Sequence, residues 1–415
     1  MKKTISLLML ALSATWVQAL PNPLKLDQAI KISAKKNLFQ QQQQLNIDHT
    51  QLQLNDLNNL YGTEATLDLE LASRSNYSAA SNNSHAFVYL KKTLFDQQIE
   101  INKSAQLSNI ANAISTLEQI QHDKTLDIMR GFFDVVLADM TYETALEKLA
   151  MAAIREGRVK DDYDVKDASE VELLEKQTHT QVSQIERIKA ESAQIKTRAK
   201  LAQLLDIDYA NRPDDVVKPD YRQLFKKEIF EFEHYQQALN NNLKLKQLQQ
   251  SLTAIKAQIS QEKDNLGIVL SSNARLGDQA YQREKNGHWR VGLNLSMPFG
   301  TDTKQTNKIS KLQLNARQKQ LEIEQYQQTI EATALDYYLA LKSLRQIHKA
   351  LLIELDYRDL YLEKARANYE MEINSDIGHA MVNVTDSERK LAENEFNYVI
   401  TLKQLHHLIG ENYEI

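Results

Sequence analysis

The sequence has no cysteine and only 10 Gly, 5 Pro and 2 Trp among its 415 residues. At average usage, roughly 30 Gly and 20 Pro would be expected in a chain of this length. Because glycine and proline are the residues that most often interrupt helices, their scarcity favours long helices and disfavours loop-rich folds. The absence of cysteine excludes disulfides, thiolate nucleophiles and cysteine-ligated zinc.

The few glycines are also too widely spaced to build a phosphate-binding loop. No two are closer than Gly287 and Gly292, so neither the GxGxxG pattern nor the P-loop pattern occurs. The ten histidines are scattered without an HExxH or comparable spacing, and the adjacent His406 and His407 are typical of a polar helix end. We therefore predict no catalytic residues, no cofactor and no metal site, and expect that the protein is not an enzyme.

The N-terminus carries the pattern of an export signal. Lys2 and Lys3 precede an apolar run from Ile5 to Val17, and Ala19 supplies a small residue for cleavage. This pattern predicts a secretory signal peptide over residues 1–19, since the apolar run is too short for a membrane anchor. Without the two lysines, 48 basic residues face 55 acidic ones, a net charge of -7. Nucleic acid is therefore not an expected partner.

Proline and charge divide the rest of the chain into two similar halves. Residues 211–220 contain two prolines and three aspartates and form the best linker between a first repeat, 20–210, and a second, 221–415. A shift of about 205 residues pairs matching positions in order, including Phe132-Phe133 with Tyr337-Tyr338. A shift of 212 pairs Asp164 with Asp376, each followed by an apolar residue and, four positions on, by alanine. We interpret the chain as an internal duplication.

Each half is predicted to contain helices and two short strands. Apolar residues alternate with polar ones in four segments, at about 65–75, 86–96, 265–276 and 289–299, and the alternation is cleanest in the last. Segments of about ten alternating residues match transmembrane β-strands, with apolar side chains toward lipid and polar ones toward water. Helical spacing then continues over about 97–158 and 304–371, long enough to indicate coiled-coil packing.

Four strands cannot form a closed membrane sheet, and an open sheet edge in hydrocarbon leaves backbone groups unpaired. Two chains would supply eight strands and three would supply twelve. Eight strands leave an interior filled by side chains, whereas the polar side chains expected inside, such as Asp68, Glu70 and Asn294, suit a wider, wet lumen. We therefore favour a trimer.

Several short motifs recur in a fixed order along the chain. They are the opening Leu24 to Ile30, the strand-to-helix junctions at Leu94-Phe95-Asp96 and Met297-Pro298-Phe299-Gly300, the two Asp-(Val/Ile)-x-x-Ala elements and the closing Leu408-Ile409-Gly410. In this order they resemble the TolC or outer-membrane-factor family over essentially the whole chain after the signal. The resemblance implies a mainly α fold with a small β part. It implies a homotrimer with a shared 12-stranded β-barrel, a long periplasmic coiled-coil α-barrel and an equatorial region around the linker.

The resemblance also implies where an entrance would lie. In this family the aspartate of the Asp-Val-x-x-Ala element lies near the periplasmic tip, which makes Asp164 and Asp376 entrance candidates, and threefold symmetry would turn each into a ring of carboxylates. The alternative is a solvated acidic helix start. The further candidates are Tyr369, Asp161, Asp162 and Asp167.

The sequence departs from the family pattern at both tips. A glycine usually stands six residues before the tip aspartate, whereas Arg158 and Glu370 occupy those positions here, with Gly157 one place early. No Arg or Lys follows Tyr369 before Asp376, which argues against a gate centred on Tyr369. Aromatic residues beside the strands, Phe87, Tyr89 and Trp289, are candidates for the membrane interface.

Together these features predict a passive exit duct of a tripartite export system, either an efflux pump or type I secretion. Its expected partners are identical subunits, a periplasmic adaptor, an inner-membrane pump of the RND or ABC type, and outer-membrane lipid. We expect the outer membrane of a Gram-negative bacterium, with an extension into the periplasm. The alternative is an exported coiled-coil scaffold without a barrel. The sequence does not indicate whether the cargo is a drug, a metal ion or a polypeptide.

Overall fold

The structure is a computed structural model that describes residues 21–35, 38–76, 79–280, 288–298, 303–371 and 376–411. The predicted signal peptide, as well as Asn37, Phe299 and Gly300, lies outside the described residues. By its contacts the chain divides into two compact units. Unit 1 comprises 1–37, 124–227 and 343–400, and unit 2 comprises 38–123, 228–342 and 401–415.

Unit 1 is built around helices that reach it from distant parts of the sequence. It contains α1 (Leu26–Lys35), α4 (Glu170–Leu204), the later parts of α3 (Gln97–Asp164) and α7 (Thr303–Glu370), and most of α8 (Ile377–Leu408). The short helices η1 (Tyr209–Asn211) and η2 (Arg222–Lys226) lie in the connection after α4. The rings of Phe133 and Phe396 stack at 4.3 Å, with Tyr221 against both, so aromatic side chains from three segments form its core.

The predicted linker takes part in packing within unit 1. Leu24, which is fully buried, forms an isolated parallel bridge with Val216. The backbone N–H of Leu24 donates to the carbonyl of Asp215 at 2.9 Å, and that of Val217 donates to the carbonyl of Leu24 at 2.9 Å. The domain boundaries at 211 and 220 remain predictions.

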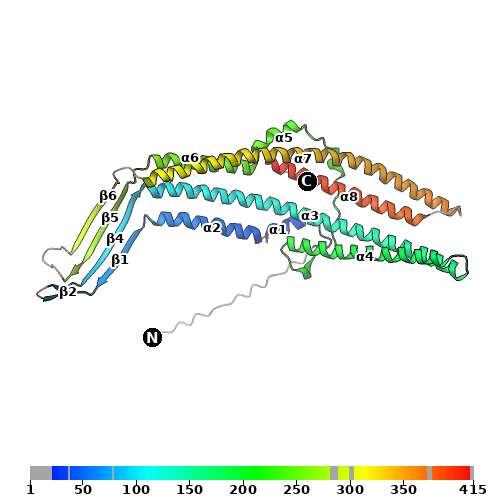
Figure 1. The fold of residues 1–415 in the computed structure, drawn as a ribbon, viewed down its shortest axis with the longest axis horizontal. Coiled ribbons are helices and arrows are strands. Elements are labelled where there is room, and N and C mark those ends of the chain that lie inside the picture. Colours follow the sequence, from blue (N-terminus) through cyan, green and yellow to red (C-terminus); the bar gives the residue numbers. More distant parts are fainter. Residues whose placement is uncertain are drawn as a thin grey trace. The chain divides into compact units, whose positions relative to one another are not determined.

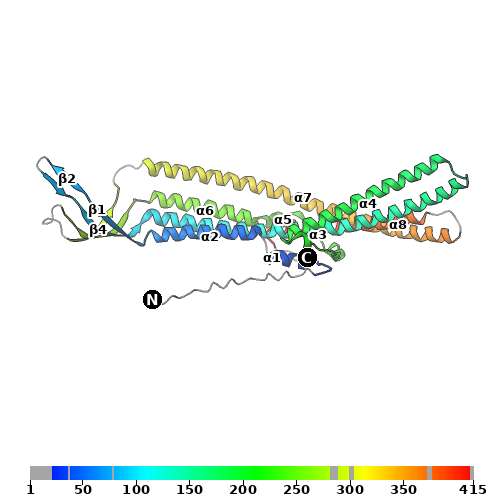
Figure 2. The same cartoon turned by 90° about the horizontal axis from the view of Figure 1, so that it is seen from below.

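Unit 2 contains a helical layer and all of the strands (Figures 1 and 2). Its helices are α2 (Leu38–Asn59), α5 (Phe232–Ala238), α6 (Leu243–Lys263), the first part of α3 and the first part of α7, and η3 (Leu239–Asn241) precedes α6. Polar side chains join neighbouring helices: Gln106 on α3 donates to the carbonyl of Thr50 on α2, and Gln247 on α6 donates to the carbonyl of Asn112 on α3. None of the described helices combines the length and apolar character needed to cross a bilayer.

The strands form an antiparallel sheet of four in the order β1-β4-β5-β6, in which each half of the sequence supplies two. They are β1 (Thr63–Glu70), β4 (His85–Asp96), β5 (Val269–Gln279) and β6 (Trp289–Ser296). A separate ladder of β2 (Ser73–Asn76) and β3 (Ala79–Asn82) connects β1 to β4. The prediction of a mainly helical chain with a small β part is confirmed.

Candidate functional sites at the sheet and at the helix ends

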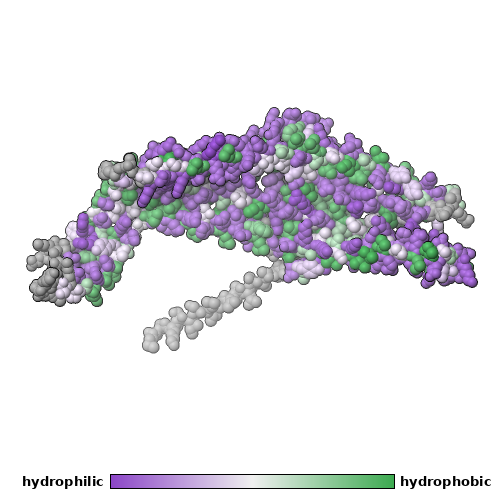
Figure 3. Space-filling view, viewed as in Figure 1, coloured by the Kyte–Doolittle hydropathy of each residue, from purple (hydrophilic) through white to green (hydrophobic). Residues whose placement is uncertain are grey.

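One face of the four-stranded sheet is largely apolar, with a polar interruption at Lys92 and Ser272, which share a row with Leu293. Side chains directly opposite one another on paired strands share a face. The pairing aligns Leu67, Val88, Leu276 and Trp289 in one row, and Ala65, Leu90, Ala274 and Val291 in the next. In β6 the odd-numbered side chains of this face are 67–75% exposed. Figure 3 shows hydrophobic residues gathered beside hydrophilic ones in the strand region.

A bulge extends this apolar face toward the helices. The register between β4 and β5 shifts between Thr93 and Phe95, which pairs Phe95 with Leu270, and Leu270 pairs in turn with Leu295. The extra residue turns Phe95 to the side that carries Leu270 and Leu295. Beyond the row that holds Lys92 and Ser272, apolar side chains therefore resume on this face at the end of the sheet where β4 leads into α3.

The opposite face is polar, and two of the three aromatic candidates for the membrane interface, Phe87 and Tyr89, lie on it. Thr66, Tyr89, Arg275 and Arg290 form one row of this face, and Phe87 pairs with Asp68 in the next. Phe87 is buried, with the guanidinium of Arg275 4.6 Å from its ring centroid. Trp289 alone of the three candidates lies on the apolar face, where it is 70% exposed.

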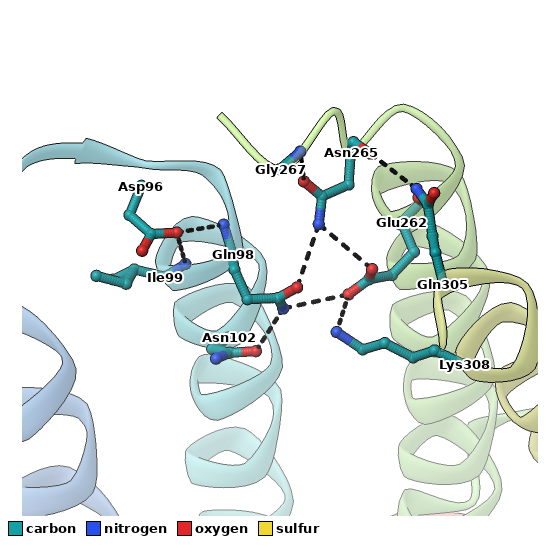
Figure 4. A network of polar contacts seen from close by, with 9 residues as sticks. All are labelled: Asp96, Gln98, Ile99, Asn102, Glu262, Asn265, Gly267, Gln305 and Lys308. Carbon is teal, nitrogen blue, oxygen red and sulfur yellow. Dashed lines mark hydrogen bonds and ion pairs between the residues drawn. The ribbon is translucent and has the colours of Figure 1, made fainter. Parts of the chain in front are cut away.

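Where the strands meet the helices, a buried carboxylate joins three segments of unit 2 (Figure 4). The side chain of Glu262, near the end of α6, is 2% exposed and forms an ion pair with Lys308 of α7. Gln98 Nε2, in the first turn of α3, donates to Glu262 Oε1 at 3.2 Å, and Asn265 Nδ2 donates to Glu262 Oε2 at 3.4 Å. The carboxylate thus has a partner on α3, on α7 and in the connection to β5.

Side chains at this site also form hydrogen bonds to the start of α3 and to the end of α6. Asp96 Oδ1 accepts from the backbone N–H groups of Gln98 and Ile99, at 2.8 and 3.3 Å, and so caps α3. Gln305 Nε2 donates to the carbonyl oxygens of Glu262 and Asn265, both at 2.7 Å. The carbonyl of Glu262 also accepts from the backbone N–H of Asn265 at 3.3 Å, so Gln305 adds a side-chain donor to the bonds that end α6. We call the set Asp96, Gln98, Glu262, Asn265, Gln305 and Lys308 the strand–helix junction.

The first helix-pair turn, between α3 and α4, is held by local backbone bonds and one cap. Lys166 has a positive φ of 69°, and the carbonyl of Asp162 accepts from the N–H groups of Asp167 and Ala168. Ser169 and Glu172 then form a capping box: Glu172 N–H donates to Ser169 Oγ at 3.2 Å, and Ser169 N–H donates to Glu172 Oε2 at 2.8 Å. This hydrogen bonding lowers the pKa of the Glu172 carboxyl.

The acidic candidates of this first turn are exposed to solvent. Within the described ranges, none of their side chains forms an ion pair or a hydrogen bond; they are Asp161, Asp162, Asp164 and Asp167. Gly157 and Arg158, which stand near the position of the family glycine, lie inside α3, because that helix continues to Asp164. The turn at this end therefore depends on Lys166 instead of on a glycine.

The second helix-pair turn, between α7 and α8, holds its aspartate differently. Asp376 precedes α8, and its Oδ1 accepts from the backbone N–H of His379 at 3.0 Å, as an N-cap does. Its Oδ2 forms an ion pair with Arg155 of α3, which also belongs to unit 1. Burial raises the pKa of the Asp376 carboxyl, but the hydrogen bonds from Arg155 and His379 outweigh burial and hold the pKa below its usual value.

The two aspartates of the repeated motif therefore stand on opposite sides of their turns. Asp164 is the last residue of α3, whereas Asp376 is the cap of α8, so the residue that corresponds to Asp376 at the first turn is Ser169. Tyr369 lies in the last turn of α7 and is 60% exposed. The residues between Met371 and Asp376 lie outside the described part of the chain.

Unit 1 also contains a cavity of about 660 Å³ with a basic lining that includes Arg222, Lys226, Arg345 and Lys349. Arg222 is paired with Asp220 at 2.7 Å, and hydrogen bonds from the guanidinium and the backbone N–H of Arg222, with a smaller contribution from its charge, lower the pKa of Asp220 to about 2. Arg345 donates to the carbonyl oxygen of Phe225 at 2.7 Å. Two of the four cations are thus already bound within the protein.

Two residues that hold these sites together, Glu262 and Arg155, did not emerge from sequence patterns. Glu262 is the one acidic residue of α6, a Gln- and Lys-rich helix, and the Asn265-x-Gly267 turn follows it, but neither feature identifies its partners. Arg155 is 221 residues from its partner Asp376. Pairs this distant in sequence become recognisable only when the helices are packed.

The fold can be compared with those of known proteins. No protein-family model and no curated protein sequence matches this chain. In structure, however, the chain matches bacterial outer-membrane channels over nearly its whole length, and the predicted likeness to the outer-membrane-factor fold is confirmed.

Three of these channels illustrate the match. The Campylobacter jejuni CmeC outer membrane channel has a TM-score of 0.76 at 13% identity, with 93% of this chain and 85% of that chain covered. The Vibrio cholerae outer membrane protein VceC has a TM-score of 0.71 at 11% identity, over 94% and 97% of the two chains. The open state of the Neisseria gonorrhoeae MtrE outer membrane channel has a TM-score of 0.71 at 13% identity, over 93% and 89%.

Proposed function

We propose that this protein is an outer-membrane exit duct, the passive channel of a tripartite export system that extends into the periplasm of a Gram-negative bacterium. The observation that carries this proposal is the sheet: one face is largely apolar and exposed, apart from Lys92 and Ser272, and the other is largely polar. A sheet with these two faces suits a wall between lipid and water. The shared fold with outer-membrane channels supports the same reading.

The edges of the sheet support a homotrimer. Among the described residues, β1 and β6 each pair with one strand only, so each leaves one edge open. An unpaired edge in hydrocarbon costs several kcal/mol for each backbone group without a partner. Three copies joined edge to edge, β1 of one to β6 of the next, would close a barrel of twelve strands and remove every open edge.

The matched elements of the two halves support the proposed duplication. Helices α3 and α7 are both 68 residues long, and each follows a strand. Helices α2 and α6 have 22 and 21 residues and each precedes a strand. Each half would thus contribute two strands and one long helix pair to the wall of the duct.

We propose that the two helix-pair turns form the periplasmic entrance. In a trimer, the exposed aspartates of the first turn would form an acidic belt that attracts cations and repels anions. Asp376 would act as a lock, because its carboxylate joins α8 to α3 through Arg155. An adaptor that pulled α8 away from α3 would have to break this pair. The adaptor and an inner-membrane pump of the RND or ABC type complete the proposed system.

A pair of neighbouring substitutions in β6 tests the membrane wall. Leu293 lies on the apolar face and Asn294 on the polar one. A cationic side chain on a lipid-facing strand position costs about 2–4 kcal/mol at the bilayer midplane, and a trimer would bear this cost three times. We expect Leu293→Arg to abolish the detergent-extracted, heat-sensitive trimer and Asn294→Arg to preserve it. A water-soluble rod that tolerates both substitutions would favour the scaffold alternative.

The entrance is tested by conductance. We expect Asp164→Asn to weaken cation selectivity in planar bilayers, because it removes three exposed charges from the belt. We expect Asp376→Asn to raise the open probability, because it removes the partner of Arg155. Unchanged selectivity and gating in both variants would remove these residues from the entrance while leaving the wall proposal intact.

A further inference from the structure

Two histidines that the sequence places far apart are in contact in unit 2. His122 lies within α3 and His407 in the last turn of α8, and their rings stack with centroids 3.2 Å apart and an interplanar angle of 9°. Asp123 follows His122, and its Oδ1 is 3.9 Å from His122 Nδ1. One ligand atom from each of the three residues lies within 4.8 Å of the others.

The ring of His122 has an unmet bonding requirement. Its side chain is 17% exposed, and its Nδ1 is inaccessible to solvent and has no hydrogen-bond partner in the part of the chain that the structure describes. Leaving a buried polar group without a partner costs about 1–3 kcal/mol. A metal ion is one species that would satisfy such a nitrogen, because a neutral imidazole offers a lone pair.

The local electrostatics keep both imidazoles neutral. Burial, with smaller contributions from His407 and Lys403, lowers the pKa of His122 to about 3. Burial also lowers the pKa of His407, although the charge of Asp123 opposes this effect. Two neutral imidazoles and one carboxylate are the ligand types that divalent zinc and its first-row neighbours prefer.

We propose that His122, Asp123 and His407 bind one divalent transition-metal ion per chain, with water completing the coordination. The ion would join the end of α8 to the middle of α3. Ligand atoms on one tetrahedral zinc ion, bonded at about 2.0–2.1 Å, lie about 3.4 Å apart. The 3.9 Å gap between His122 and Asp123 closes to this value by a small movement of Asp123, whose side chain is 73% exposed.

The stacked rings require one further adjustment. The lone pair of an imidazole nitrogen lies in the plane of its ring, so two parallel rings do not direct their lone pairs at one point. Binding therefore turns one ring about its Cβ–Cγ bond. His407 is the ring that would turn, because it lies in the last turn of α8, whereas His122 is held within a long helix.

Calorimetry with Zn²⁺ on the tag-free full-length protein, purified in detergent and stripped with chelator, tests the site. We expect one Zn²⁺ per chain, an affinity at least ten-fold lower in His407→Gln and in His122→Gln, and a smaller loss in Asp123→Asn. His406→Gln is the matched control, because His406 is next in sequence but pairs with Glu411 at 2.9 Å; its affinity should equal that of the unaltered protein.

A second measurement keeps the proposal testable if a histidine variant fails to fold. Cu²⁺ bound to the unaltered protein should show paramagnetic-resonance couplings to two imidazole nitrogens, and Zn²⁺ should raise its thermal unfolding midpoint. Absence of stoichiometric Zn²⁺ binding, coupling to fewer than two nitrogens, or an equal loss of affinity in His406→Gln would each overturn the proposal. None of these results bears on whether the protein is a duct.

Discussion

The strand–helix junction and the helix-pair turns both end long helices, but they do so with very different degrees of burial. At the junction, Glu262 is almost inaccessible and has partners on α3, on α7 and before β5. At the turns, the side chains are exposed, and the bonds are local caps plus one ion pair between exposed groups.

This contrast indicates which region is built to stay fixed. A buried charge network stabilises one arrangement strongly, because loss of any partner leaves a buried charge or polar group without a bond. Exposed caps and ion pairs are each worth about 1 kcal/mol or less, so a partner protein can replace them at low cost. A rigid wall and an adjustable entrance are what the proposed duct requires.

The largest effect is expected at the junction. Glu262→Ala leaves Lys308, Gln98 and Asn265 without their common acceptor and should lower the free energy of unfolding by about 3 kcal/mol. Chemical denaturation followed by circular dichroism measures the change. Glu322→Ala is the control, since Glu322 forms an exposed pair with Lys319 at 2.6 Å and should cost less than about 0.5 kcal/mol. An equal loss of unfolding free energy in the two variants would contradict the conclusion that the buried contacts stabilise the protein more than the exposed ones.

The next largest effect is expected at the capping box of the first helix-pair turn, which Ser169 and Glu172 form. Ser169→Ala removes the acceptor for the N–H of Glu172 and should cost about 1 kcal/mol. Faster amide exchange confined to the first turn of α4 is the expected signature. Ser192→Ala, at an exposed position within the same helix, should leave exchange at that turn unchanged. A spread of fast exchange along the whole of α4 would contradict a local role for the cap.

At Lys166, in the same turn, a substitution is expected to stabilise the protein, whereas the two preceding substitutions destabilise it. Its φ of 69° lies in the left-handed region, where a non-glycine side chain costs about 1 kcal/mol. We expect Lys166→Gly to raise the thermal unfolding midpoint slightly. Lys160→Gly, at an exposed position inside α3, should lower it, because glycine costs about 1 kcal/mol within a helix. The same sign in both variants would refute the argument from backbone conformation.

The smallest effect is expected from the titration of Asp376. Its pKa is below the usual value of 3.8 in the folded protein, so its contribution to stability is present above pH 3.8 and is lost as the pH falls through the folded pKa. The protection of the backbone amides at the start of α8 from exchange, measured relative to an unstructured chain at the same pH, should therefore fall below about pH 4 in the unaltered protein. In Asp376→Ala, which lacks a side-chain acceptor for the N–H of His379, this protection should already be low at neutral pH and depend less on pH. An identical profile in both proteins would disprove the cap.

The pattern of residues was a reliable guide to the strands and long helices, for physical reasons that act locally. Alternation in 289–296 reflects two different solvents on the two faces of β6, and the scarcity of Gly and Pro allows helices of 68 residues. The aromatic candidates were harder to assign to a face of the sheet, because the sequence of a single strand does not reveal which face lipid will cover. Phe87 and Tyr89 lie on the polar face, and only pairing with β5 and β6 distinguishes them from Trp289.

The sequence by itself determined the element types, the two-faced strands and the similarity of the two halves, because periodicity and propensity depend on neighbours along the chain. Only the tertiary structure decided which side chains meet across helices: Glu262 with Lys308, Asp376 with Arg155, and His122 with His407. It also separated Asp164 from Asp376, since a motif of five residues does not fix on which side of a turn it falls. Long-range pairing depends on helix packing, which no local pattern encodes.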